Sequence, residues 1–464
     1  MSGYSNVTYE EIAVGATASA ERVLGQSEIE ALLLVSGDVV PFHVEEGSAA
    51  VEPGEFCVEA VAAEAIISGM LERRLPGPGT RIVSQQLEFH GVIRVGDLVR
   101  ATVTVREKAA ENRRVLFDCT VEAAGETVLR GTVIVEAPIR KASFPEMARP
   151  EFMIRRNDVF DRLLKRCEPL APVTCAVAHP CDPDSLVGAL EAARRNLIVP
   201  ILVGPSARIR ALAGTLGEDL AGFRLVDTEH SHASAAAAVA LARSGEVETL
   251  MKGSLHTDEI MTAVISAQGG LRTERRVSHV FVMDVPAYDR ILFVTDAAIN
   301  IEPTLREKAD IAQNAIDLAR NLGIDTPKVA ILSAVEMVNP DITSTIDAAA
   351  LCKMADRGQI RGAILDGPLA FDNAISEIAA RTKSIESPVA GRADILLVPN
   401  IEAGNMLAKQ LQYFAGADSA GIVLGARVPV ILTSRADNVR MRIGSAAVVK
   451  LVVHARRAAI PPLK

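Results

Sequence analysis

The feature that most constrains this chain is an alternation of short, fully apolar segments with alanine-rich helical stretches, which begins after residue 150. Short apolar runs bounded by turn residues are typical of strands buried on both faces, as in a parallel sheet covered by helices. The alternation therefore predicts a largely parallel α/β sheet. The segments expected as strands are Cys175–Ala178, Ile198–Val203, Thr249–Met251, Val329–Ser333, Gly362–Asp366, Ile395–Val398 and Val430–Thr433.

The first part of the chain has a different pattern. A helical stretch is expected from about Val58 to Arg74, ended by the run Pro76–Gly79, and a shorter helix over Glu28–Val35. Apolar and polar residues then alternate with a period of two, as in strands with one buried face. A helix followed by antiparallel strands predicts an α+β unit in which a sheet wraps one helix. The alternating segments are Val99–Arg106, Val115–Val121 and Thr127–Val135.

The change of pattern divides the chain. A length of 464 residues is too great for one ordinary core, so several domains are expected. Prolines and charged residues gather near residue 145, which is typical of a linker. We predict a domain over residues 1–140, a linker over 141–152 and a second domain over 153–464.

Composition and charge narrow the classes of function. The net charge of −9 disfavours a general nucleic-acid binder, but a local group of arginines, lysines and helix N-termini still suits a phosphate. None of the six cysteines forms a C-x-x-C pair, which favours free thiols over zinc or disulfides. We expect no signal peptide and no membrane-spanning run. The chain is therefore expected to be cytoplasmic, with no metal and no cofactor besides its substrates.

Two polar residues of the first domain stand five positions apart in Ser36–His43, SGDVVPFH. Asp38 and His43 are expected at the rim of the sheet, where an Asp and a His that share a water can act as general base and acid. The segment resembles the MaoC-like, or hydratase 2, family of hot-dog-fold enoyl-CoA hydratases. Further resemblance, over roughly residues 8–137, lies in Ser68–Leu71, Leu75–Thr80, Gln86–Phe89 and Val95–Asp97.

This resemblance implies that water is added across the double bond of a 2-enoyl-CoA, with a backbone N–H holding the thioester oxyanion. The sequence departs from the family's pattern at Val40, where Asn is usual, and at Glu59–Ala60, where a His–Gly pair is usual. Two interpretations therefore stay open: an active hydratase domain, and a non-catalytic domain that binds CoA or dimerises. The residues implied are the catalytic pair Asp38 and His43 and the substrate-binding residues Ala60 and Ser68.

After residue 150, polar turns follow the apolar segments. Met251–Thr257, MKGSLHT, can offer backbone N–H groups, hydroxyls and the Lys252 ammonium to a phosphate, and Lys252 and Thr257 are its candidate binding residues. Together with four later motifs, this turn resembles the phosphate acetyl/butyryltransferase family over roughly residues 150–462, in details closer to the butyryltransferase-like branch. The later motifs are Leu292–Pro303 (LFVTDAAINIEP), Asp366–Ala374 (DGPLAFDNA), Pro399–Lys409 (PNIEAGNMLAK) and Pro429–Asp437 (PVILTSRAD).

The resemblance implies transfer of a short acyl group, acetyl or butyryl, between CoA and phosphate. It places Ser434 and Arg435 in the active site, where a planar arginine suits phosphate and carbonyl oxygens and a serine can hydrogen-bond the leaving sulfur. In phosphotransacetylases an Asp seven residues after this serine is thought to act as base. Here that position is Met441, so the base is unassigned.

The family fold resembles isocitrate and isopropylmalate dehydrogenases, which implies two lobes with a cleft between them. We place lobe 1 at about 153–290 plus 433–464 and lobe 2 at about 291–432. Asn300, Asn373 and Asn405 are expected to line the cleft as substrate-binding residues. Weaker candidates at similar turns are Asp296, Asp366 and Glu402, and His230 and His232 are expected in an exposed loop rather than at a metal.

The sequence thus predicts a multidomain protein, in which an α+β hot-dog domain is followed by a two-lobed α/β acyltransferase. Its partners are acyl-CoA, enoyl-CoA and phosphate or acyl phosphate, with no nucleic acid or membrane, and a homo-oligomer is expected because both families are usually dimeric. Three alternatives remain: a non-catalytic first domain, a metal-dependent dehydrogenase on the same α/β fold, and a non-enzymatic scaffold.

Overall fold

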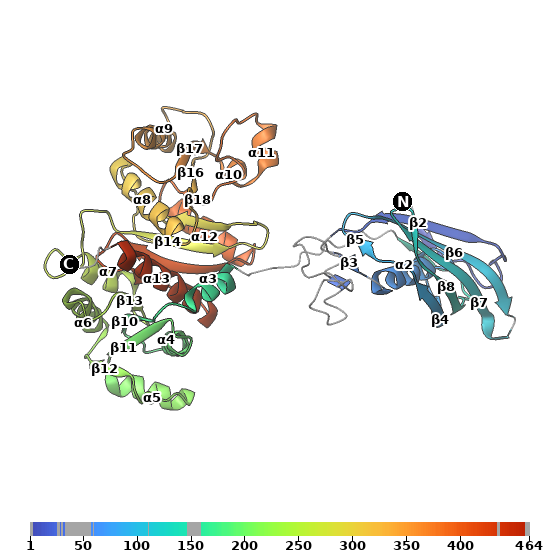
Figure 1. Cartoon of the computed structure of the whole chain (residues 1–464), viewed down its shortest axis with the longest axis horizontal. Coiled ribbons are helices and arrows are strands. Elements are labelled where there is room, and N and C mark those ends of the chain that lie inside the picture. The colour runs from blue at the N-terminus through green and yellow to red at the C-terminus, as the bar shows by residue number, and fades with distance from the viewer. Residues whose placement is uncertain are drawn as a thin grey trace. The chain divides into compact units, whose positions relative to one another are not determined.

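The structure of the protein is a computed structural model. The chain forms two compact units, Met1–Ile154 and Arg155–Lys464 (Figure 1). Among the described residues, no helix has the length and apolar character that crossing a bilayer requires. The structure describes residues 3–25, 28, 31–32, 57–58, 60–109, 111–145, 159–433 and 437–459.

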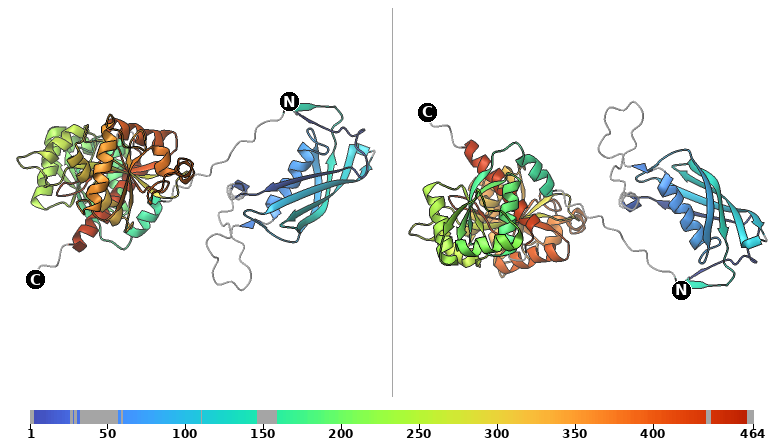
Figure 2. Two further views of the ribbon diagram at one scale, coloured as in Figure 1. Left: turned by 90° about the horizontal axis from the view of Figure 1, so that it is seen from above. Right: turned by 90° about the horizontal axis from the view of Figure 1, so that it is seen from below.

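The N-terminal unit is built from one helix and a curved sheet. Within its described residues, five antiparallel strands pair in the order β2-β6-β7-β8-β4. Helix α2, Ala60–Arg73, lies across one face of this sheet and contacts all five strands (Figure 2). The strands are β2 (Thr17–Val23), β4 (Arg81–Phe89), β6 (Leu98–Ala109), β7 (Arg114–Ala123) and β8 (Glu126–Glu136).

The period-two pattern accounts for this arrangement. Val99, Ala101, Val103 and Val105 of β6 are buried, whereas the residues between them are less buried or exposed. Since successive side chains of a strand point to opposite faces, the buried set forms one wall of a core that α2 closes. The edge strands β2 and β4 were not predicted as strands, and all their residues are half-buried or exposed.

Two predicted segments of this region differ from the structure or lie outside its described residues. The helix expected over Glu28–Val35 lies largely outside the described residues. The linker expected over 141–152 is wrong at its start, because Ser143–Pro145 forms strand β9 and pairs with β1, Gly3–Ser5. Those residues belong to the N-terminal unit, since their backbone hydrogen-bonds to it.

The C-terminal unit contains one large sheet. Across its described residues, eleven strands pair in the order β12-β11-β10-β13-β20-β19-β14-β15-β18-β16-β17. The strands are β10 (Val173–Ala178), β11 (Ile198–Gly204), β12 (Arg224–Asp227), β13 (Thr249–Lys252), β14 (Ser278–Asp284), β15 (Ile291–Thr295), β16 (Lys328–Leu332), β17 (Ile364–Leu369), β18 (Ile395–Leu397), β19 (Asp418–Leu424) and β20 (Val430–Ile431).

The predicted lobe boundaries are wrong at the centre of this sheet. The prediction put Ser278–Asp284 in lobe 1 and Asp418–Leu424 in lobe 2, but these strands, β14 and β19, pair antiparallel over their whole length. They join a parallel set of strands on one side to another parallel set on the other. The reversal lies in hydrogen-bonded strands rather than in a connection, so a pattern of apolar segments does not reveal it.

Helices cover both faces of the sheet (Figure 1). On one face a single core cluster runs through both halves, under α3, α4, α5, α8, α9 and α13. On the other face the core is divided into a cluster under α6 and α7 and a separate cluster under α10, α11 and α12. The two-lobed character is therefore a property of one face only.

The helices of this unit begin and end as follows: α3 Val159–Cys167, α4 Pro183–Arg194, α5 Ser206–Leu216, α6 Ser231–Ser244, α7 Thr257–Ile265, α8 Leu305–Asn321, α9 Thr343–Asp356, α10 Phe371–Ile375, α11 Glu377–Thr382, α12 Ile401–Tyr413 and α13 Val439–Ala459.

Candidate active site

A cavity of about 700 Å³ draws its lining from both halves of the divided face. Thr257 and Leu432 reach it from the half under α6 and α7, and Phe281 and Asn405 from the half under α12. It lies beside the carboxyl ends of β15 and β20, where open α/β sheets bind ligands. Its full lining is Thr257, Phe281, Ala298, Ile401, Glu402, Asn405, Met406, Lys409, Leu432 and Thr433.

Thr433 is held from two sides. Lys252, buried at the end of β13, donates from Nζ to the Thr433 backbone oxygen across 3.3 Å. Arg442 on α13 donates from Nη1 to the Thr433 Oγ1 across 2.7 Å. Ser434 and Arg435, the predicted catalytic pair, follow directly in the chain and lie outside the described residues. The two cations therefore position Thr433, the residue that directly precedes this pair in the chain.

Arg442 was missed by the sequence reasoning. It is 2% exposed, and burial lowers the pKa of its guanidinium, while the nearby Asp182, Asp437 and Asp184 carboxylates raise it. The sequence feature that could have identified Arg442 is its place directly after Met441, the position where the family carries a base. Met441 itself uses its backbone N–H to bond the Asn438 side chain at the start of α13.

The turn after β13 brings Lys252 and Thr257 to the same region, Lys252 behind Thr433 and Thr257 at the cavity wall. Gly253 allows this course, because a Cβ there would lie 2.5 Å from the Ala178 oxygen and 2.6 Å from the His179 oxygen. The glycine of the MKGSLHT motif is thus required by a close approach to the end of β10.

Asn300 does not line the cavity, contrary to the prediction. It is buried, and its Nδ2 donates to the Val277 oxygen and to Asp296, while its Oδ1 accepts from Arg276. Asp296 also accepts the backbone N–H groups of Ala298 and Ile299. These two side chains shape the turn after β15, and only Ala298 of this turn reaches the cavity.

Asn405 does reach the cavity, and its Nδ2 donates to the Ala297 oxygen across 3.2 Å. The neighbouring Glu402 lines it as well. Gly404 lets α12 approach the turn closely, because a Cβ there would lie 2.9 Å from the Asp296 oxygen and 3.1 Å from the Ala297 Cα. The PNIEAGNMLAK motif therefore forms one wall of the site.

Asn373 is also misplaced by the prediction. It lies fully buried in α10, bonds Glu336 through Nδ2 and is not part of the cavity lining. Asp366, a weaker candidate, accepts from the Gly367 backbone N–H within β17. Turns after parallel strands gather at one edge, and within the described residues this cavity is bordered by those that follow β13, β20, β15 and β18, two on each side of the antiparallel pair.

The apolar floor of the cavity has a second layer beneath it. The Phe281 ring meets the His279 ring edge-on, with centroids 4.4 Å apart. Burial lowers the pKa of His279, although the Asp296 carboxylate raises it. The imidazole is therefore neutral near pH 7 and acts as packing for Phe281.

The predicted site of the N-terminal unit is described only in part. Asp38 and His43 lie outside the described residues. Ala60 is the first residue of α2, and Ser68 is half-buried within the same helix. The backbone N–H groups in the first turn of α2 have no partner within the helix itself, as in any α-helix.

His230 and His232 form the start of a helix rather than a loop. The His230 side chain accepts from the Ala233 backbone N–H as the cap of α6, and His232 lies within its first turn. No group of three residues among those described has the arrangement of a metal site.

An open α/β sheet with a cavity at the carboxyl ends of its strands, beside buried cations, is typical of an enzyme that acts on an anionic substrate. Residues 231–449 match the model of the phosphate acetyl/butaryl transferase family. A phosphate acetyltransferase of Rhizobium meliloti is 61% identical over 300 residues, 65% of this chain and 95% of the relative. The chain belongs to the phosphate acetyl/butyryltransferase family.

Two solved structures are similar to separate parts of this chain. A branched-chain phosphotransacylase from Enterococcus faecalis is 31% identical and matches with a TM-score of 0.54, over 61% of this chain and 99% of that one. The unliganded R-hydratase PhaJ1 from Pseudomonas aeruginosa is 30% identical and matches with a TM-score of 0.30, over 33% of this chain and 99% of that one. The 61% identity to an acetyltransferase does not support the expected leaning toward the butyryltransferase-like branch.

Proposed function

We propose that residues 153–464 move an acetyl or butyryl group between CoA and phosphate in the cavity beside Thr433. The observation that carries this proposal is the hold of Lys252 and Arg442 on Thr433, directly before Ser434 and Arg435. A site for a phosphate dianion needs cations in fixed positions, and Lys252 and Arg442 are two buried cations that bind Thr433, next to this pair in the chain.

In this proposal a phosphate oxygen attacks the thioester carbonyl, a C–O bond forms, and the tetrahedral intermediate collapses with loss of the C–S bond. The acyl phosphate and the CoA thiolate are the products, and the phosphate proton passes to the thiolate or to solvent. Arg435 stabilises the phosphate and the oxyanion, and Ser434 donates to the departing sulfur. Because Met441 carries no titratable group, that position neither gives a proton to the departing thiolate nor takes one from the CoA thiol in the reverse direction.

The cavity has an apolar side that suits a short acyl chain. Phe281, Leu432 and Met406 contribute it, and Leu432 lies two residues before Ser434. A carbonyl held by Ser434 and Arg435 would direct its acyl chain over these side chains. Burying each methylene there stabilises the complex by about 0.8 kcal/mol.

The test measures CoA release from acyl-CoA thioesters of increasing chain length, with and without phosphate. We expect phosphate-dependent release that Arg435→Gln abolishes and Lys252→Met lowers by about tenfold or more. The matched control is Lys165→Met, which removes an exposed lysine of α3. Release that is independent of phosphate, or unchanged in Arg435→Gln, contradicts the proposal.

For the N-terminal unit we propose a hot-dog domain that hydrates 2-enoyl-CoA. A sheet wrapped around α2 supports this proposal, together with the SGDVVPFH segment. Water would add as hydroxide to C3 and as a proton to C2, with Asp38 as base and His43 as acid. The N–H groups at the start of α2 would bind the thioester oxygen.

Crotonyl-CoA hydration tests this second activity. We expect Asp38→Asn to abolish hydration while phosphate-dependent CoA release persists, and Ser434→Ala to do the reverse. Each variant is thus the control for the other. If wild type lacks hydration yet binds crotonyl-CoA, the non-catalytic CoA-binding alternative holds. Turnover of a nicotinamide cofactor would instead support the dehydrogenase alternative.

A further inference from the structure

A second cavity of about 480 Å³ lies in the C-terminal unit and shares no lining residue with the active-site cavity. It is bordered by the last turns of α8, the last turns of α13 and the end of β19. Its polar lining includes three arginines, one each from α8, α13 and the segment before β14, and its apolar side is formed by Leu318, Leu424 and Val452. The arginines are Arg275, Arg320 and Arg456, and the acids are Asp317 and Asp325.

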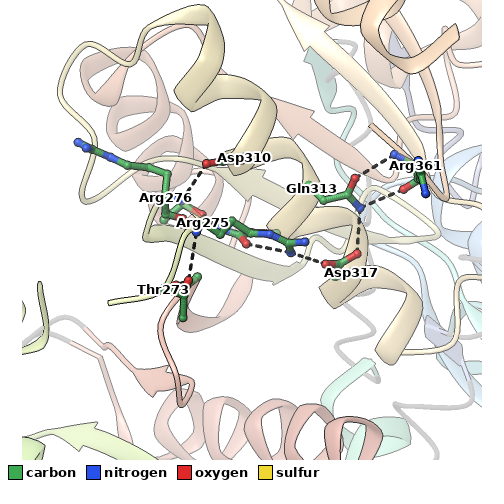
Figure 3. Close-up of polar contacts among 10 residues, drawn as sticks. Thr273, Arg275, Arg276, Asp310, Gln313, Asp317 and Arg361 are labelled. Atoms are coloured by element: carbon green, nitrogen blue, oxygen red, sulfur yellow. Dashed lines mark hydrogen bonds and ion pairs between the residues drawn. The ribbon is translucent and has the colours of Figure 1, made fainter. Parts of the chain in front are cut away.

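The Asp317 carboxylate is already occupied. Arg275 donates to its Oδ2, and Gln313 donates to its Oδ1 across 2.9 Å. Gln313 is fixed in turn by two hydrogen bonds with the Arg361 backbone. Figure 3 shows this chain of contacts along α8, from Arg275 through Asp317 and Gln313 to Arg361. Asp317 therefore pairs with Arg275, and both of its oxygens already accept a hydrogen bond.

Arg456 is half-buried and donates to the Arg427 backbone oxygen. Burial lowers the pKa of Arg456, the nearby Arg275 charge lowers it further, and Asp317 raises it. Within the described part of the chain, neither Arg456 nor Arg320 has a carboxylate at ion-pair distance. A half-buried guanidinium beside a second one is costly unless an anion accompanies it.

We infer that this cavity binds a small phosphate-bearing anion, at a site separate from the catalytic one. A tetrahedral phosphate presents oxygens in several directions, which matches arginines that come from two helices and a loop better than a planar carboxylate does. The volume exceeds that of one phosphate group, and the Leu318–Leu424–Val452 side leaves room for an apolar part. The ligand class is thus a phosphate ester or an oligophosphate.

The position of the site gives its occupant a structural effect. Helix α8 follows the turn after β15, and α13 follows the segment of Ser434 and Arg435. A phosphate bound by Arg320 of α8 and Arg456 of α13 would join these two helices at their far ends. Binding to the folded state alone also raises its thermal stability.

The experiment is a calorimetric titration of the full chain with pyrophosphate, and separately with succinate at matched ionic strength. We expect pyrophosphate to bind and succinate to bind at least tenfold more weakly. Arg456→Gln and Arg320→Gln should each weaken pyrophosphate binding by about tenfold or more, since each removes a charge-assisted hydrogen bond. Arg210→Gln, an exposed arginine of α5, is the matched control.

Pyrophosphate can also enter the catalytic cavity, so the titration is repeated with Lys252→Met. Binding that survives Lys252→Met and is lost in Arg456→Gln supports the second site. The inference is overturned if pyrophosphate does not bind, or if binding is lost in Lys252→Met but kept in both arginine variants. It is also overturned if size-exclusion shows that Arg456→Gln dissociates an oligomer, because a second copy would then fill the cavity.

Discussion

The Arg442 guanidinium donates to the Thr433 hydroxyl across 2.7 Å. Thr433 follows β20 and directly precedes Ser434 and Arg435, and Arg442 lies in the first turns of α13, which follow them. The hydrogen bond therefore joins the two ends of the segment that contains the predicted catalytic pair. We expect Arg442→Gln to lower kcat/KM by about a hundredfold, because a misplacement of about 1 Å at a catalytic group has an effect of this size. Circular dichroism should show a folded variant.

A double-mutant cycle with Thr433→Val separates positioning from general damage. If the hydrogen bond carries the effect, Thr433→Val has a similar loss and the double variant is little worse than either single variant. Strictly additive losses would contradict this interpretation.

Phe281 forms the floor of the cavity and should limit acyl-chain length. Phe281→Leu keeps an apolar side chain but frees space beside Leu432, so we expect kcat/KM for butyryl-CoA to rise relative to acetyl-CoA by about tenfold, the usual weight of a methylene in such a pocket. The measurement is the ratio of the two constants. Phe293→Leu, beneath the opposite face of the sheet, serves as control for a general loss of packing.

Lys308 and Asp347 form an ion pair between α8 and α9, with Nζ and Oδ2 2.7 Å apart and side chains 6% and 13% exposed. Removing one partner leaves an uncompensated buried charge, so Asp347→Ala should lower the free energy of unfolding by about 3–5 kcal/mol. The double change Lys308→Met with Asp347→Leu should restore most of this loss. Urea unfolding checks both, and equal losses in the single and double variants would refute the argument.

Cys119 gives the N-terminal unit a pH-dependent stability. Burial, with a smaller contribution from the Asp118 carboxylate, raises the pKa of its thiol to about 12. Since the folded pKa lies above the unfolded value, this contribution is complete below about pH 9 and is lost as pH rises through about 12. Wild type should therefore lose more stability than Cys119→Ala between about pH 8 and pH 11 in urea unfolding. Equal losses would show that other groups dominate.

Much of the fold follows from local patterns. The expected strand Val99–Arg106 lies within β6, and the expected helix from Val58 to Arg74 is α2 to within two residues at each end. Both depend on periodic burial, which neighbouring residues already encode. β14 was not among the expected strands, and its antiparallel pairing with β19 depends on contacts more than a hundred residues apart, which no local pattern records.

The candidate site shows the same limit. Asn405 and Asn300 were predicted alike, because both follow apolar strands in matching motifs. Only the tertiary structure separates them: the Asn300 amide donates to Asp296 of its own turn and to the distant Val277 backbone oxygen, whereas α12 presents Asn405 to the cavity. Arg442 was missed because its partner Thr433 is chosen by the packing of α13 on the end of the sheet.

By itself the sequence determined that this chain has an α+β part and an α/β part, and which motifs lie at strand ends. Those properties arise from side-chain periodicity and from glycines at close approaches. The tertiary structure alone decided that both halves of the α/β part share one sheet and that its core is continuous on one face and divided on the other. Strand pairing and helix packing join residues that are distant in the chain, and the division they create is where the cavity opens.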